Sequence, residues 1–283
     1  MRLDYKTFTG RRSGFVLVAA CLILLSWGVF AVCSKQIADL LSQHMGDNRV
    51  LAAMLLIQNG LVVLSVLIAA LATEHDHPLK EKLGLAIDPG YSLQFLFPVF
   101  VIAVLATIGA QVGLTYLLKA LGREAKEQSM VEFFRTLRPL AFAGFAMITV
   151  IAAPIAEELA FRHIFYRFVR VLLYRKEAAV VVSLVFALFH VQLAALFQTK
   201  PFPWEMLVVP VVPLFVLALF LQWQYEKSKS VIPSTLIHAG FNLISVILLA
   251  LEVIYGTPQE KTTEPSDLEE TPVQAVVQSD YNG

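Results

Sequence analysis

The chain has 283 residues, of which 57% are hydrophobic and only 16% are charged, and its basic and acidic side chains balance to a net charge of zero. Soluble globular domains carry about 25% charged residues, so this composition excludes an ordinary soluble domain and predicts an integral membrane protein embedded in a lipid bilayer. The zero net charge gives no indication of nucleic acid as a partner, because proteins that bind it present a strongly basic surface.

The first apolar run, residues 14–32, follows a short basic segment, residues 1–13. This order resembles a secretory signal, but the run is longer than a typical signal core and no small-residue cleavage motif follows it. We therefore expect a retained transmembrane helix, with the basic segment in the cytoplasm and the protein in the plasma (inner) membrane. Cys21 and Cys33 are too far apart along such a helix to form a disulfide, so we expect free thiols.

Six further apolar runs predict six more helices. The fold class is therefore all-α, a polytopic membrane protein of seven or eight transmembrane helices with its active site between helices. A polar loop is expected at residues 34–49, between the first two helices. The six runs are residues 50–72, 93–118, 140–160, 178–197, 206–224 and 231–253.

Three polar segments lie between or beyond these helices. Residues 119–138 mix charges with aromatic residues, which favours an amphipathic interfacial helix or an eighth membrane segment. Residues 74–77 read Glu-His-Asp-His and look like metal ligands, but a solvated loop is the favoured interpretation. The acidic tail, residues 256–283, is predicted to be disordered.

The second helix carries adjacent amides, Gln58 and Asn59, and the third carries the pair Gly109 and Gly113. Amides inside a membrane protein commonly form hydrogen bonds between helices, and glycines spaced by four allow close helix packing. We expect both features to serve helix packing and not chemistry.

The most unusual stretch follows the apolar run 140–155, where Glu157, Glu158 and Arg162 stand close together. An ionisable side chain inside a bilayer costs about 2.5–3.5 kcal/mol on insertion scales, so three of them together call for a reason. On a helix, Glu158 and Arg162 share a face and can pair, whereas Glu157 points about 100° away from Glu158. We expect Glu158 to be held structurally and Glu157 to be available for chemistry. The alternative is that the acidic pair marks the membrane–water boundary at a helix end.

Two later apolar runs carry the other polar residues of interest. His190 lies four residues after Phe186, and His238 lies four residues before Asn242. Because such polar side chains are unfavourable against lipid, we expect the helices to turn them inward, toward Glu157. Each of them alone would more readily be explained as an interhelical hydrogen-bonding residue.

The order Glu-Glu-x-x-x-Arg, Phe-x-x-x-His and His-x-x-x-Asn in a polytopic membrane protein resembles the CAAX prenyl endopeptidase and abortive-infection family, also called the CAAX protease and bacteriocin-processing family. The resemblance covers about residues 140–251, which we expect to be the protease-like core of one membrane domain, residues 14–255. It implies a membrane-embedded, glutamate-dependent endopeptidase.

The resemblance also implies roles for individual residues. Glu157 and His190 would activate a water molecule, and His238 and Asn242 would form an oxyanion hole. The supporting residues would be Glu158, Arg162 and Phe186.

Other chemistries stay open at this point. A zinc site built from one glutamate and two histidines would suit a metalloprotease, although the chain has no His-Glu-x-x-His motif, so we expect no metal cofactor while leaving zinc open. Ser234, one turn before His238, and Ser183, two turns before His190, could act as nucleophiles, but we expect both to be packing residues. His163, which adjoins the acidic motif, is expected to be non-catalytic.

The expected substrate is a peptide or protein in the membrane, prenylated or not, cleaved near its C-terminus. Bacteriocin or peptide processing and self-immunity are alternatives within the same family. Outside it, a proton-coupled transporter or a non-catalytic membrane scaffold would also place polar residues inside a bundle. A transporter should show internal repeats, and none is apparent in the sequence.

Overall fold

The computed structural model describes residues 12–72, 78–123, 137–191 and 204–255. Within these ranges the chain is helical apart from short connections, and no β-strand occurs. The predictions for the N-terminal basic segment, the Glu-His-Asp-His loop, most of the expected interfacial helix and the acidic tail fall outside the described residues.

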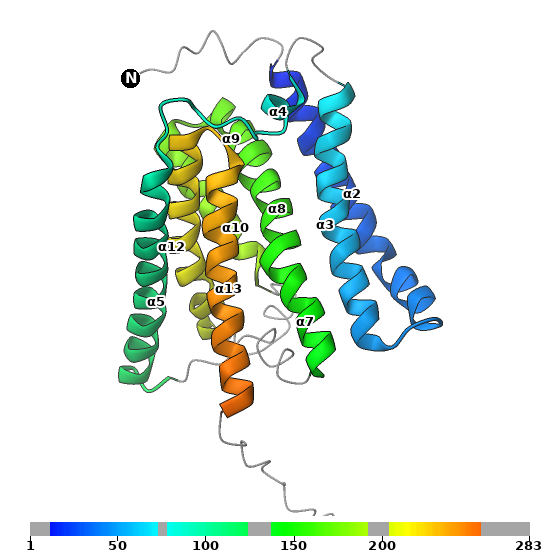
Figure 1. Ribbon diagram of the computed structural model, residues 1–283, viewed down its shortest axis with the longest axis vertical. Helices are drawn as coiled ribbons and strands as arrows, with labels where there is room; N and C mark the ends of the chain where they lie inside the picture. Colours follow the sequence, from blue (N-terminus) through cyan, green and yellow to red (C-terminus); the bar gives the residue numbers. More distant parts are fainter. Residues whose placement is uncertain (1–11, 73–77, 124–136, 192–203, 256–283) are drawn as a thin grey trace, which may run out of the picture.

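The helices form one bundle in which most axes run roughly side by side (Figure 1). In the described part of the chain, six helical stretches are long and apolar enough to cross a membrane, and α10 adds a shorter helix of 15 residues packed against α12. The all-helical, polytopic fold predicted from the sequence is thus confirmed. In chain order the main helices are α2 (Arg12–Ser42), α3 (Asp47–Ala72), α5 (Leu96–Ala120), the continuous series α7 to α9 (Pro139–Leu172), α10 (Arg175–Phe189), α12 (Trp204–Ser228) and α13 (Val231–Tyr255).

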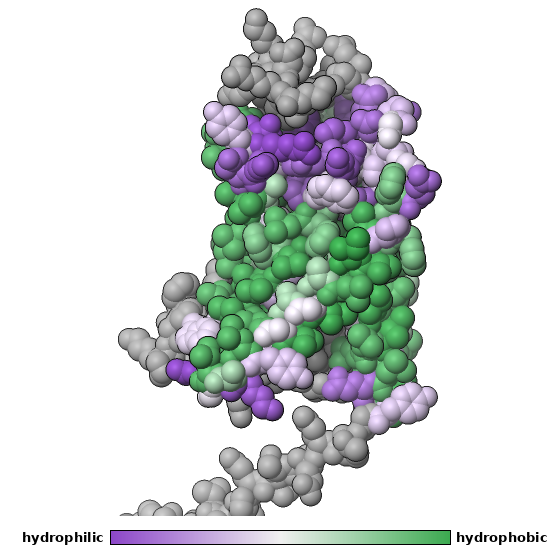
Figure 2. Space-filling view, turned by 90° about the vertical axis from the view of Figure 1, so that its left-hand side faces the viewer, coloured by the Kyte–Doolittle hydropathy of each residue, from purple (hydrophilic) through white to green (hydrophobic). Residues whose placement is uncertain are grey.

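The outer surface of the bundle suits a bilayer. Figure 2 shows a broad apolar belt over the helices, bounded at one end by a hydrophilic band. Large apolar side chains such as Leu24, Leu105 and Leu140 are more than half exposed, which is expected where lipid replaces water as the surrounding medium.

The expected polar loop at residues 34–49 is wrong. α2 continues to Ser42 and α3 begins at Asp47, so only four residues connect them. The segment 33–42 contains no glycine or proline and is rich in good helix formers, so the helix continues after its apolar run ends. α10 ends at Phe189, which is earlier than the predicted helix 178–197.

The interhelical role expected for the paired amides and glycines is also wrong. Asn59 donates to the carbonyl of Leu55 in its own helix at 2.8 Å, and Gln58 is exposed. A Cβ added at Gly109 or Gly113 would meet no atom within 4 Å, so neither glycine allows a close helix contact within the described residues.

The fourth membrane stretch, Pro139–Leu172, is continuous through the acidic pair but is not a uniform α-helix. Two π-helical segments interrupt it, η2 (Ile148–Ala152) and η3 (Glu158–Phe165). The short α-helix α8 (Ala153–Glu157) lies between them, and α9 (Tyr166–Leu172) completes the stretch. π-Helical turns are rare and occur frequently at functional sites.

A short connection fastens one end of the bundle. After α4 (Leu79–Lys82), Gly84 adopts a φ of +68°, and its carbonyl accepts hydrogen bonds from the backbone of Val231 and the hydroxyl of Ser230. The backbone of Asp88 donates to the carbonyl of Ser228. The segment between α3 and α5 is therefore tied to the turn between α12 and α13.

Candidate active site

The acidic pair lies near the middle of the 34-residue stretch Pro139–Leu172 and not at its end. The predicted helix end at residue 160 is therefore wrong, because the helical stretch continues past the pair to Leu172. Glu157 is the last residue of α8 and Glu158 is the first residue of η3, so the backbone changes from α to π geometry between the two carboxylates.

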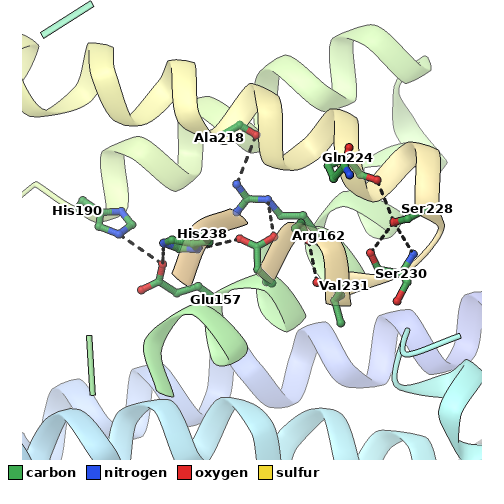
Figure 3. Close-up of polar contacts among 11 residues, drawn as sticks. Glu157, Arg162, His190, Ala218, Gln224, Ser228, Ser230, Val231 and His238 are labelled. Atoms are coloured by element: carbon green, nitrogen blue, oxygen red, sulfur yellow. Dashed lines mark hydrogen bonds and ion pairs between the residues drawn. The ribbon is translucent and has the colours of Figure 1, made fainter. Parts of the chain in front are cut away.

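The Glu157 carboxylate faces two histidines from two other helices (Figure 3). Its Oε2 lies 3.5 Å from Nε2 of His190, at the end of α10, and 3.8 Å from Nε2 of His238, in α13. The Glu157 side chain is 26% exposed and the His190 side chain 31% exposed, whereas His238 is almost fully buried. Glu157 and His190 therefore form the accessible part of the cluster.

Glu158 points the other way and is fully buried. Its Oε2 lies 3.3 Å from Nε of Arg162, and its Oε1 lies 3.1 Å from Nδ1 of His238. The pairing of Glu158 with Arg162 expected from their spacing is confirmed. His238 thus lies between the two carboxylates, with one ring nitrogen toward each (Figure 3).

Phe186 is the apolar centre around which these groups gather. The Arg162 guanidinium lies 4.3 Å from the centre of its ring, and the rings of His190 and His238 lie at 4.6 and 5.7 Å. Phe186 itself is fully buried. Its ring therefore contacts both histidines and the Arg162 guanidinium and limits how these side chains can move.

The backbone fixes the ring orientation of His190. Nδ1 of His190 lies 2.8 Å from the carbonyl oxygen of Phe186, which can only accept, so Nδ1 carries a proton. In the neutral imidazole, Nε2 then presents a lone pair toward the Glu157 carboxylate. Two acceptors that face each other in this way need a shared proton or a bridging water molecule.

Asn242 shares a face of α13 with His238 but makes a different contact. Its side-chain Nδ2 donates to the carbonyl of Thr149 at 2.9 Å. Thr149 lies in the π-helical segment η2, where the i→i+5 pattern alters which carbonyls find partners within the helix. Asn242 therefore ties α13 to the helix that carries Glu157, and its second N–H is not used in this contact.

The other candidates from the sequence do not join the cluster. His163 is buried against the carbonyl of Lys82 at 2.6 Å and the hydroxyl of Tyr225 at 3.4 Å, which fastens α4 to the bundle. The Ser234 hydroxyl donates to the carbonyl of Val231 in its own helix at 3.0 Å. Ser183 is buried and forms no hydrogen bond within the described residues. Cys21 and Cys33 are free, as expected.

Among the residues the structure describes, no group of three or more histidine, cysteine or acidic side chains is arranged to hold a metal ion. A groove with a volume of roughly 560 Å³ lies between α2 and α3, where it is lined by residues such as Lys35, Asp39 and Met54. None of Glu157, His190 and His238 lines it.

Residues 139–244 match the family model described as type II CAAX prenyl endopeptidase Rce1-like. The core of this chain is Rce1-like. The resemblance expected from the motifs is confirmed, and the matched segment includes Glu157, His190, His238 and Asn242. The Rce1-like match indicates a membrane protease of the CAAX type that acts on a protein substrate. Comparisons with curated proteins and with solved structures gave no match.

Several contacts of the Rce1-like core were not anticipated from the sequence. The contact between His238 and Glu158 joins a histidine expected to contribute to an oxyanion hole to the carboxylate expected to have a supporting role. Gln222 is buried beside this region, and the sequence pattern could have singled it out as a polar residue within an apolar run. It lies four residues after Ala218, and the side chain of Arg162 donates to the carbonyl of Ala218 at 3.5 Å.

Proposed function

We propose that this chain is an intramembrane endopeptidase that hydrolyses a peptide bond near the C-terminus of a membrane-associated or lipidated peptide. The observation that supports it best is the position of Glu157. Its carboxylate belongs to a residue near the middle of the helical stretch Pro139–Leu172, is partly exposed, and lies within 4 Å of Nε2 of two histidines. A carboxylate and an imidazole at this separation leave space for a water molecule that both can hold.

In the proposed reaction, Glu157 takes a proton from the water molecule while the water oxygen attacks the scissile carbonyl. His190 orients that water, because its Nε2 faces Glu157 and its ring is fixed by the Phe186 carbonyl. The proton then passes from Glu157 to the leaving nitrogen as the carbon–nitrogen bond breaks. No covalent intermediate with the protein is needed.

His238 and Asn242 are proposed to stabilise the oxyanion that forms on the carbonyl oxygen. The Nδ1 proton of His238 is directed to Glu158, so donation to the oxyanion requires protons on both ring nitrogens. Asn242 has a second N–H besides the one it donates to Thr149. Glu158 and Arg162 act as positioning residues, because they hold the His238 ring.

The test compares wild type with Glu157→Gln, purified in detergent, on a quenched farnesylated CAAX peptide with and without a chelator. Glu177→Gln, an exposed change in the first turn of α10, is the matched control. We expect cleavage by wild type and the control and a loss of at least about 1,000-fold in Glu157→Gln, since a general base and its water are removed. Both variants should elute as folded protein.

The other outcomes are equally informative. Cleavage that is lost with chelator and restored by zinc would replace the glutamate mechanism by a metal-dependent one. Cleavage of the unprenylated peptide alone would assign peptide processing in place of prenylated substrates. Glu157→Gln with wild-type activity would refute the proposed role of Glu157.

We also infer that the end of the bundle that carries α4 and the C-terminus of α9 faces the cytoplasm, with the protein in the plasma (inner) membrane. The last turn of α9 carries Arg170 and the last turn of α12 carries Lys227, and cytoplasmic segments are enriched in basic residues. Figure 2 shows that one end of the bundle is hydrophilic. In a cysteine-free background, a thiol reagent applied outside cells should label a cysteine at Arg123 and not one at Lys229. The reverse pattern would invert the orientation.

A further inference from the structure

Three fully buried polar side chains next to the candidate active site each have polar atoms without a hydrogen-bond partner among the described residues. These atoms are Nη1 of Arg162, the hydroxyl oxygen of Ser183, and both the oxygen and the nitrogen of the Gln222 amide. Ser183 and Gln222 are each only 1% exposed and Arg162 is 0% exposed. Most buried polar groups in proteins have a partner, so each of these requires an explanation.

The helix contacts bring the three side chains to one place. The Arg162 guanidinium lies over Phe186 of α10 and reaches the carbonyl of Ala218 of α12. Ser183 precedes Phe186 by three residues on the buried face of α10, and Gln222 follows Ala218 by four residues on α12. Because α10 and α12 are packed against each other and run in opposite directions, Ser183 and Gln222 are displaced toward the same end of the bundle, each by about one helical turn from the residue that Arg162 contacts.

A second set of contacts supports the conclusion that the side chain of Gln222 points toward η3. Three residues beyond it, Tyr225 lies on the same face of α12 and contacts His163, the residue after Arg162. Ala218 and Tyr225 both belong to the main buried cluster, together with Phe186 and Val182 of α10. Gln222 is therefore flanked on its own helix by two residues that contact η3, and this register directs its side chain toward η3.

We propose that buried water molecules link the Arg162 guanidinium to Ser183 and Gln222, and that these two side chains position the active site. Water is the ligand that satisfies donors and acceptors of mixed type in an enclosed polar space. The link continues through Arg162 to Glu158 and through Glu158 to Nδ1 of His238. Ser183 and Gln222 thereby fix the His238 ring without contact with the substrate. This role deepens the proposed function and rests on it only for its effect on catalysis.

The principal measurement is independent of activity. The ¹⁵N chemical shifts of the His238 ring report which nitrogen carries the proton, and His238→Gln assigns the signals. We expect Nδ1 to be protonated in wild type, because it faces the Glu158 carboxylate at 3.1 Å. In Gln222→Met, which keeps the side-chain length but removes both polar ends, the Nδ1 and Nε2 shifts should move toward those of mixed tautomers.

Control variants distinguish a positioning role of Ser183 and Gln222 from a general effect of removing a buried polar group. Thr107→Val removes another fully buried hydroxyl without a partner, on α5 in a different part of the bundle, and should leave the His238 signals unchanged. Ser183→Ala should resemble Gln222→Met, and Gln222→Asn, which keeps the amide and leaves room for water, should restore the wild-type spectrum. On a cleavable peptide, Gln222→Met should lower kcat roughly three- to tenfold with KM nearly unchanged, the effect of one weakened hydrogen-bonded link.

The outcomes separate this inference from the proposed function. His238 signals that are identical in wild type, Gln222→Met and Ser183→Ala would overturn it. In the wild type, the side-chain amide protons of Gln222 should also show cross-relaxation with water, and its absence would refute the water link even if a variant failed to fold. If the protein cleaves no peptide, the proposed function fails, yet the histidine spectra still decide the positioning role.

Discussion

The buried pair of Glu158 and Arg162 allows a quantitative prediction for Arg162→Met. Removing one partner of a buried ion pair commonly costs about 3–5 kcal/mol, because the other charge is left unpaired. Two features of this site reduce the cost. Glu158 keeps its contact with His238 at 3.1 Å, and the substitution also removes Nη1 of Arg162, which is buried without a hydrogen-bond partner among the described residues. We therefore expect a loss of unfolding free energy near the lower bound, about 3 kcal/mol.

The double variant Glu158→Gln with Arg162→Met tests this reasoning. It removes both charges and fills the space with side chains of similar length, so its unfolding free energy should lie within about 1 kcal/mol of wild type. The coupling energy of the cycle should then be at least about 2 kcal/mol. Reversible unfolding in mixed micelles, followed by circular dichroism, provides the free energies.

A matched control comes from an exposed pair. Arg175 pairs with Glu226 at one end of the bundle, and its side chain is 51% exposed. Arg175→Met should cost less than about 1 kcal/mol, because solvent screens such a pair. Additive effects of the two core substitutions, within about 0.5 kcal/mol, would show that the buried charges are not coupled and would refute the argument.

Three further outcomes follow from single contacts. Asn242→Ala leaves the Thr149 carbonyl without its partner and should lower the unfolding free energy by about 1–3 kcal/mol, measured in the same micelles; an unchanged stability would mean that this bond does not hold α13. Gly84→Ala should cost at least about 1–2 kcal/mol, because φ is +68° and the new Cβ would collide with the ring of His163. The purified variant should melt at lower temperature, and an unchanged melt would contradict the geometry. His190→Gln, at a partly exposed side chain, should keep its melting temperature and lose peptide cleavage; retained cleavage would remove His190 from the proposed mechanism.

The helical bundle could be predicted well from the sequence, because a membrane helix is indicated mainly by the length of one apolar run, which is a local property of the chain. Helix ends were less predictable. Past Val32 the chain is polar, yet α2 continues to Ser42, since helix propensity continues where hydrophobicity ends. The pairing of Glu158 with Arg162 could be predicted from spacing alone, because both residues belong to one helix.

Contacts between different helices could not be predicted from the spacing of residues within one helix. The bond from His238 to Glu158 depends on the rotation of α13 about its axis, and no periodicity in either segment encodes it. The π-helical turns are also invisible in the residues themselves, because they arise from how the helix fits its neighbours. The surroundings of Gln222 could be recognised only once Ala218 and Tyr225 were seen against η3.

The two contacts of α13 have a consequence for how a peptide reaches Glu157. On one side of this residue Asn242 fastens α13 to Thr149, and on the other His238 fastens it to Glu158. These two contacts hold α13 to the helix of Glu157 on both sides of this carboxylate, so separating the two helices there requires both of them to break. The His190 side chain, at the end of α10, is nearly a third exposed and takes part in neither contact.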